Sequence, residues 1–256
     1  MTSASPAPRF DIGRVISRLV GVLGRNLGTF LALSALLVGL PSAAVLLAGL
    51  SAAPESPSGL GAGIASTLVA LVANAVLQGA LIHGTVCDLA GKPASFGDSL
   101  GAGVRFLLPL AAIGLVSAIA IGFALLLFVV PGVLLWLAWM VAAPAEVMER
   151  RGVFGALGRS AELTRNHRGA ILGLAVLYLV ILAFAQGLAN AFVAVFGGFS
   201  ASASMLAPDR ILPAVATLIV QTLTALVSSA GAASIYYELR VVKDGIGAAQ
   251  LAAVFD

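Results

Sequence analysis

The chain has 256 residues, of which 60% are hydrophobic and 10% are charged, with 14 Lys and Arg residues against 11 Asp and Glu. No soluble core of this size needs so much apolar side chain, so the composition excludes an ordinary soluble domain. The net charge of +3 comes from arginines at the ends of apolar runs and not from a basic surface with interleaved aromatic residues, which excludes a nucleic-acid partner.

The amino-terminal region contains a short leader followed by an amphipathic segment. Residues 1–8 are rich in small residues and proline, and we expect them to be disordered. Over residues 10–25 apolar side chains recur at helical spacing, while Arg14, Arg18 and Arg25 share the other face. This predicts an interfacial helix whose arginines bind anionic headgroups. A plain extension of the first span is the alternative, because three glycines weaken the helix.

Six apolar runs approach the roughly 20 residues that cross a hydrocarbon core. The fold class predicted is all-α, a polytopic membrane protein with six transmembrane helices and the N-terminal interfacial amphipathic helix, forming one domain over residues 9–256. Ser95 and Asp98 have the spacing of a helix cap before the third span. The sequence VVPGV then predicts a tight turn into an antiparallel fourth span. The predicted spans are 29–50, 64–87, 105–130, 130–144, 169–195 and 212–236.

The most polar segment, residues 146–168, is the predicted cytoplasmic loop. Spacings of three and four residues join Glu146 to Arg150, Arg159 to Glu162 and Glu162 to Arg165, which predicts a surface helix with weak side-chain pairing. We expect this loop, like the interfacial helix, to contact lipid headgroups. Its candidate residues are Arg150, Arg151, Arg159, Arg165 and Arg168.

The distribution of basic residues predicts the orientation in the membrane. Of the 14 Lys and Arg residues, Arg210 alone falls on the far side of the six spans, which leaves 13 on the near side. Cytoplasmic loops carry the excess of Lys and Arg. We therefore expect a multi-pass protein of the bacterial cytoplasmic (inner) membrane with both termini in the cytoplasm.

Amides are the polar groups that the predicted spans contain. Asn74 and Gln221 lie at similar depths, about 14 to 15 Å from the outer ends of their spans. The simpler interpretation is a hydrogen bond between these two spans that stabilises the bundle. The other interpretation is a polar path or a lipid-headgroup cavity. The candidate intramembrane residues are Asn74, Gln78, Gln186, Asn190 and Gln221.

Motifs that would indicate catalysis or metal binding are weak. His83 and Cys87 have the spacing of two helical metal ligands, and His167 is predicted at the same membrane edge, but a structural zinc site normally needs four ligands. Neither a GxSxG elbow nor a phosphate-binding GxxxxGK[ST] loop occurs in the sequence. We therefore predict a protein that is not an enzyme, with no metal and no cofactor.

Two stretches carry a resemblance to a known family: VVPGVLLWLAWMVAAPAEVMERRGVFGALGRSAELTRNHRGAILG and, near the end, IYYELRVVKDG. They resemble the bacterial membrane domain that precedes some glycerophosphodiester phosphodiesterase domains and that elsewhere stands alone. The resemblance implies fold and topology. Residues His167, Arg168 and Gly169 repeat the HRG motif of the associated enzyme, but here they open a span, so we expect the catalytic domain to be absent.

The function predicted from these observations is a non-enzymatic inner-membrane protein of lipid or envelope homeostasis that binds lipid. The alternative is a transporter or channel for a neutral or amphipathic solute, with the amides lining its path. The expected partners are membrane lipids with anionic headgroups, and a homo-oligomer or another membrane protein stays open as a further partner.

Overall fold

The computed structural model describes residues 10–39, 41, 58–92, 95–197 and 208–245. All regular elements in these ranges are helices, and six helical segments are long and apolar enough to cross a membrane. The predicted all-α polytopic membrane fold is therefore confirmed. The predicted leader at 1–8, most of the predicted outer half of the first span and the loop around Pro54 lie outside the described residues.

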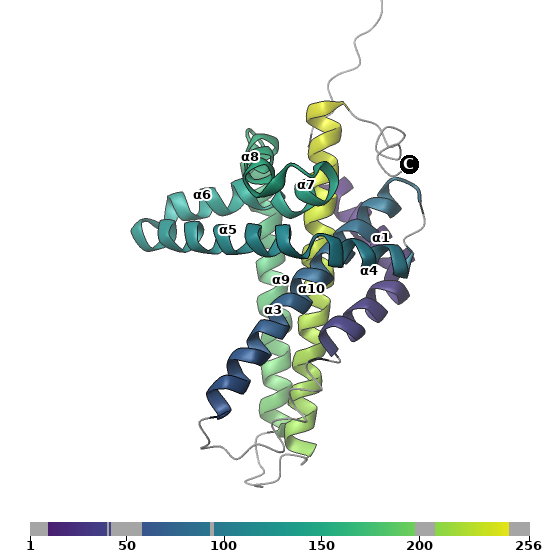
Figure 1. The fold of residues 1–256 in the computed structure, drawn as a ribbon, viewed down its shortest axis with the longest axis vertical. Helices are drawn as coiled ribbons and strands as arrows, with labels where there is room; N and C mark the ends of the chain where they lie inside the picture. Colours follow the sequence, from purple (N-terminus) through teal and green to yellow (C-terminus); the bar gives the residue numbers. More distant parts are fainter. Residues whose placement is uncertain (1–9, 40, 42–57, 93–94, 198–207, 246–256) are drawn as a thin grey trace, which may run out of the picture.

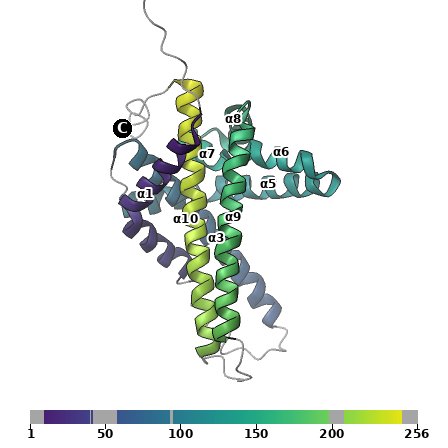
Figure 2. The same ribbon diagram turned by 180° about the vertical axis from the view of Figure 1, so that it is seen from behind.

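The elements follow one another as helices of very different length, shown in Figure 1. The long helices α9 and α10 run side by side along the longest axis of the molecule, and α3 crosses beside them (Figures 1 and 2). The bounds are α1 (Ile12–Ser34), η1 (Ala35–Gly39), α3 (Ser58–Leu89), α4 (Phe96–Arg105), α5 (Leu107–Leu127), α6 (Val129–Trp139), α7 (Ala142–Glu149), α8 (Gly152–Thr164), α9 (Arg168–Gly197) and α10 (Pro208–Asp244).

The first helix differs from its prediction. Asp11 caps α1 by accepting a hydrogen bond from the Gly13 amide at 2.7 Å, and the helix then continues without interruption to Ser34. The predicted boundary after Arg25 is wrong, because Asn26 stays helical and donates its side-chain amide to the Val22 carbonyl. The helix changes direction along its length instead of breaking (Figure 2). A continuous helix agrees with the alternative, an extension of the first span.

Most of the core lies where helices from the whole chain meet at one end of α9 and α10. Val15 of α1, Ile82 of α3 and Leu137 of α6 are buried there against Ile171 of α9 and Leu239 of α10. We call this region the basic end, because it holds the arginines of α1, α8 and the carboxyl-terminal part of α10. A second cluster joins α1 to α3 and α10 through side chains that include Phe30, Leu81 and Leu226.

Helices α5 and α6 form a hairpin, as the VVPGV sequence predicts. Phe128 alone separates the two helices, and they touch so closely that a Cβ at Gly132 would lie 2.5 Å from Leu125 side-chain atoms. The hairpin runs crosswise to α9 and α10 and projects from the basic end (Figures 1 and 2). The direction of the hairpin relative to α9 and α10 could not be predicted from the length of its apolar sequence.

The predicted fourth span is divided into α6 and α7. A proline at position 144 has no amide hydrogen to continue a helical ladder, and Ser160 of α8 satisfies the interrupted backbone. The Ser160 hydroxyl donates to the Ala138 carbonyl at 2.7 Å and accepts from the Val141 amide at 3.2 Å. One buried hydroxyl thus joins three helices.

The segment 146–168 contains two helices instead of one. Arg150 ends α7 in the left-handed conformation, with φ of 49°, and α8 begins two residues later. Of the predicted pairs, Arg159 and Glu162 form an ion pair at 3.3 Å. The structure describes no ion pair from Glu146 to Arg150 or from Glu162 to Arg165 within this segment, because both arginines follow the ends of their helices.

Helix α4 follows the predicted Ser95 cap, whose hydroxyl accepts from the Asp98 amide, and packs on α3 at two glycines. A Cβ at Gly103 would lie 2.3 Å from the Val76 carbonyl oxygen, and one at Gly79 would lie 3.1 Å from the Gly103 Cα. The two backbones therefore meet without room for a methyl group.

Replacement of Gly103 by Ala should lower stability by about 1 to 3 kcal/mol, because overpacking at a backbone contact forces the helices apart. Gly101→Ala is the matched control, since nothing lies within 4 Å of a Cβ in that position of the same helix. Thermal unfolding in detergent, followed by tryptophan fluorescence, measures both. Equal melting temperatures for the two variants would contradict the contact.

Candidate functional site

Two carboxylates with little exposed surface hold ion pairs at the basic end, and the first is Glu149 at the end of α7, whose side chain is 9% exposed. Its Oε1 accepts from the Nε of Arg159 at 3.1 Å and from the hydroxyl of Tyr236 at 2.9 Å. Its Oε2 lies 2.7 Å from the Nε of Arg151. Arg159 also pairs with Asp244 at the end of α10. This cluster ties α7, α8 and α10 together.

The second carboxylate is Glu238 of α10, whose side chain is only 1% exposed. Arg14 approaches its Oε1 with Nη2 at 2.7 Å, and Arg18 pairs with its Oε2. The Arg18 guanidinium also lies over the ring of Tyr237, at 4.8 Å from the ring centroid. Tyr236 and Tyr237 are both buried, so their rings do not face lipid as those of an interfacial aromatic belt would.

Arg159 stays charged in this cluster. Burial alone would lower the pKa of its guanidinium, but the hydrogen bond to Glu149 and the charges of Glu149 and Asp244 raise that pKa above its ordinary value. The positive charge therefore compensates a carboxylate that would otherwise be buried without a counterion.

The arginines predicted to bind headgroups fall into two groups. Most pair with carboxylates of this chain, and the following partners were not predicted from the sequence: Glu238 for Arg14 and Arg18, Asp88 for Arg25, and Glu149 for Arg151 and Arg159. The others form no ion pair with a described residue: Arg150, which lies 5.8 Å from the Phe106 ring centroid, the exposed Arg165, and Arg168.

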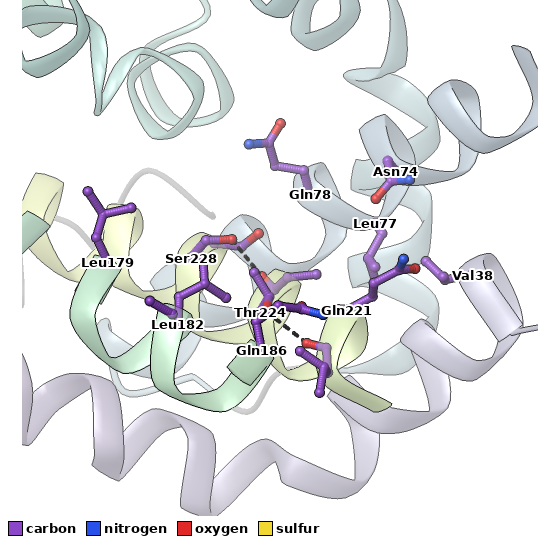
Figure 3. A pocket seen from close by; sticks show the side chains of 14 residues that line it. Val38, Asn74, Leu77, Gln78, Leu179, Leu182, Gln186, Gln221, Thr224 and Ser228 are labelled. Carbon is purple, nitrogen blue, oxygen red and sulfur yellow. Dashed lines mark hydrogen bonds between the residues drawn. The ribbon is translucent and has the colours of Figure 1, made fainter. Parts of the chain in front are cut away.

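A pocket of about 840 Å³ lies between η1, α3, α9 and α10, away from the basic end (Figure 3). Four of the five predicted intramembrane amides line it, from three helices: Asn74, Gln78, Gln186 and Gln221. Asn190 is not in the lining but accepts a hydrogen bond from Gln186 at 3.3 Å. Hydroxyls of α10 and apolar side chains complete the wall: Thr224, Ser228, Ser229, Val38, Leu77, Leu179, Leu182, Ala183, Val220 and Ala225.

The predicted hydrogen bond between Asn74 and Gln221 is not formed. The Asn74 amide donates to the Ala70 carbonyl of its own helix at 2.9 Å. Both side chains line the same pocket from different helices, without the direct contact that was predicted. The structure describes no hydrogen bond from Gln78 or Gln221 to another described residue.

The pocket lies deep along its helices. Gln78 is 11 residues from the end of α3 at Leu89, and Gln186 is 11 residues from the end of α9 at Gly197. At 1.5 Å per residue each amide is about 16 Å or more from either end of its helix. An amide at hydrocarbon depth needs hydrogen-bond partners.

The lining has no charged side chain. Thr224 and Ser228 donate their hydroxyl hydrogens to carbonyls of α10, at 2.7 and 3.2 Å, and keep lone pairs that can accept. Together with the amides they can hydrogen-bond an uncharged polar group. These hydroxyls were not predicted from the sequence, although Thr224 and Ser228 follow Gln221 by three and seven residues, which places all three side chains on one helical face.

His83 and Cys87 contact each other, with Sγ at 3.7 Å from the imidazole nitrogens. Among the described residues no group of three or more His, Cys, Asp or Glu side chains gathers to hold a metal ion. His167 instead packs its ring on Phe10, with centroids 5.8 Å apart.

Comparison with known proteins gives two matches. The family model described as Domain of unknown function (DUF7847) matches residues 94–239, from before α4 into the basic-end part of α10. A UPF0259 membrane protein of Pectobacterium carotovorum subsp. carotovorum (strain PC1) is 31% identical over 116 residues. That alignment covers 45% of this chain and 46% of the relative, so the chain spans about half of the relative's length. No solved structure matches.

These matches correct the family resemblance drawn from the sequence. Neither the matching model nor the relative is a glycerophosphodiester phosphodiesterase-type protein, so that assignment is wrong. The stretches that suggested it, around Pro131, Pro144 and Arg159, make the hairpin, the α6–α7 break and the Glu149 cluster. These stretches are features of the fold and do not indicate an enzyme family.

Replacement of Glu238 by Ala should lower stability by about 2 kcal/mol, because two arginines lose a buried counterion while remaining partly hydrated. Glu162→Gln is the matched control, since that side chain is 64% exposed and its single pair should contribute almost nothing. Thermal unfolding at low and high salt measures both variants. A Glu238 variant as stable as the Glu162 variant would show that the Glu238 pairs do not hold α1 on α10.

Proposed function

The chain belongs to the family described as Domain of unknown function (DUF7847), and we propose that its membrane domain binds an uncharged amphipathic lipid in the pocket between α3, α9 and α10. The family description names no activity, and the relative's name says only that it is a membrane protein. The proposal therefore rests on the pocket. The observation that carries it is a wall without charged residues that contains amides and hydroxyls and lies far from the ends of helices long enough to cross a membrane.

The lining selects the chemistry of the ligand. A phosphate or ammonium group at this depth would need a counterion, and no lining residue supplies one. A hydroxyl or amide headgroup can instead bond to Asn74, Gln78 and Gln221. Leu77, Leu179 and Leu182 provide the apolar surface that an acyl chain would contact.

Binding without catalysis is the form of this function that the site supports best. The pocket contains no nucleophile paired with a base and no carboxylate that could act as an acid. We place the protein in lipid or envelope homeostasis of a bacterial inner membrane, with the basic end in the cytoplasm as the excess of Lys and Arg favours. Arg150 and Arg165 are the residues we propose to meet anionic headgroups there.

The alternative function, a transporter or channel for a neutral solute, would use the same amides. The apolar leucines in the wall favour the lipid. Swelling of proteoliposomes in glycerol distinguishes the two functions, because a solute pathway would increase the swelling rate and a lipid site would not.

The double variant Asn74→Leu, Gln221→Leu should lose binding of a neutral lipid by about tenfold or more, because each lost hydrogen bond at this depth contributes on the order of 1 kcal/mol. The probe is a photoactivatable diacylglycerol in vesicles that hold the full chain. Crosslinked peptides are mapped by mass spectrometry, and we expect them in α3 and α10.

Leu223→Ala is the control, since this side chain lies in α10 at the same depth, is exposed, and is not part of the lining. It should crosslink like the unchanged protein. Equal capture of photoactivatable phosphatidylglycerol, or undiminished capture by the double variant, would contradict a neutral lipid site.

A further inference from the structure

The α5–α6 hairpin is apolar on all sides and largely uncovered. Between Phe106 and Glu146 the sequence has no charged residue, and the tip residues Leu126–Val130 are 59% to 82% exposed. Side chains further back along α5 are also uncovered, including Leu115, Ile119 and Phe123. Such a surface needs an apolar environment.

The hairpin meets the long helices at one level only. Leu110 of α5 and Leu137 of α6 share a buried cluster with Ile171 and Ala175 of α9. Those α9 residues are three and seven positions after Arg168, which is about 5 to 10 Å along the helix. The next 22 residues of α9, from Ala175 to Gly197, extend about 33 Å further, enough to cross the hydrocarbon core.

If the hairpin ran antiparallel to α9, its tip would cover this lower part of α9. Instead Val180, Phe184 and Leu188 of α9 are exposed, as is Phe128 at the tip. The hairpin lies crosswise to α9 and α10 in both views (Figures 1 and 2). In a bilayer that is crossed by α9 and α10, the hairpin would therefore lie roughly in the membrane plane.

The surroundings of the hairpin place it in one leaflet. Its one face packs against α8, where Ile113 of α5 meets Ala156 and Leu157, while α8 turns Arg159 toward the ion pairs of the basic end. The two tryptophans of the chain, Trp136 and Trp139, lie in α6 beside this contact. Tryptophan is enriched at the boundary between headgroups and hydrocarbon.

We propose that the α5–α6 hairpin does not cross the membrane but lies in the leaflet at the basic end, with lipid acyl chains around it. The candidate spans that cross are then those of α1, α3, α9 and α10, an even number, which leaves the start of α1 and the end of α10 on the same side. The hairpin increases the area that the protein occupies in that leaflet and anchors α8 at its surface. The inference is independent of the lipid pocket.

Spin-label depth tests this proposal in nanodiscs that hold one copy of the full chain. Single cysteines replace Leu115, Ile119, Phe123 and Leu126 in turn, in a Cys87→Ala background that keeps the labelled position unique. Collision with oxygen and with a water-soluble nickel complex reports the depth of each label. The four labels should lie at one depth, within about 5 Å, and be shielded from nickel.

A matched series in α9 replaces Leu177, Val180, Phe184 and Leu188, which are also exposed and whose first and last positions, like those of the α5 series, are 11 residues apart. Their depths should change steadily over about 16 Å, as a crossing helix requires. The same gradient in the α5 series would overturn the proposal and show a spanning hairpin. Nickel access at all four α5 positions would overturn it by placing the hairpin in water.

A second copy of the chain is the other occupant that could cover the hairpin. A spin label at Phe128 in nanodiscs with two copies tests it, because docking of two hairpins would broaden the spectrum by dipolar coupling. Broadening that persists when unlabelled lipid is in large excess would overturn the lipid assignment. An unbroadened spectrum from the label at Phe128, together with shallow and uniform depths of the four α5 labels, supports the assignment of lipid acyl chains around the hairpin.

Discussion

The structure depends on the neutralisation of two carboxylates that lie inside the protein at one end of the bundle. Glu238 takes its counterions from Arg14 and Arg18 of α1, 224 and 220 residues away in the sequence, whereas Glu149 takes its counterions from nearby Arg151 and from Arg159 of α8, which is 10 residues away. A buried carboxylate without a counterion would be strongly destabilising, so each pair specifies which helices meet. Most of the arginines that suggested binding to lipid headgroups instead pair with carboxylates of this chain.

This arrangement separates two regions of different chemistry. Charged groups gather at the basic end, where they bond to one another and to Tyr236. The pocket of about 840 Å³ between α3, α9 and α10 is lined by amides, hydroxyls and apolar side chains, without a charged residue. A ligand that enters there meets hydrogen-bonding groups without a net charge, which is why we assign an uncharged headgroup. The crosswise hairpin projects from the basic end and packs against α8.

Local and compositional features were predicted correctly from the sequence. Apolar length alone found the six candidate segments, and the Ser95 cap and the VVPGV turn follow from residue chemistry that acts within a few positions. Long-range contacts were not predictable in this way. The partner of Arg18 is 220 residues away, and no local pattern connects it to Glu238. Hydropathy likewise gives the length of an apolar helix and not its direction, so the crosswise course of α5 and α6 could not be predicted from it. The pocket amides were found because polar groups are rare in spans, while Thr224 and Ser228 were overlooked because hydroxyls there are common.

A double-mutant cycle on Glu149 and Arg159 tests most directly whether buried ion pairs organise the fold. The variants are Glu149→Gln, Arg159→Gln and the two combined, and the quantity measured is the free energy of unfolding in detergent. The account predicts that each single change is strongly destabilising and that the double change costs less than the sum, with a coupling on the order of 2 kcal/mol. Additive effects within about 0.5 kcal/mol would contradict it, because the two side chains would then contribute independently.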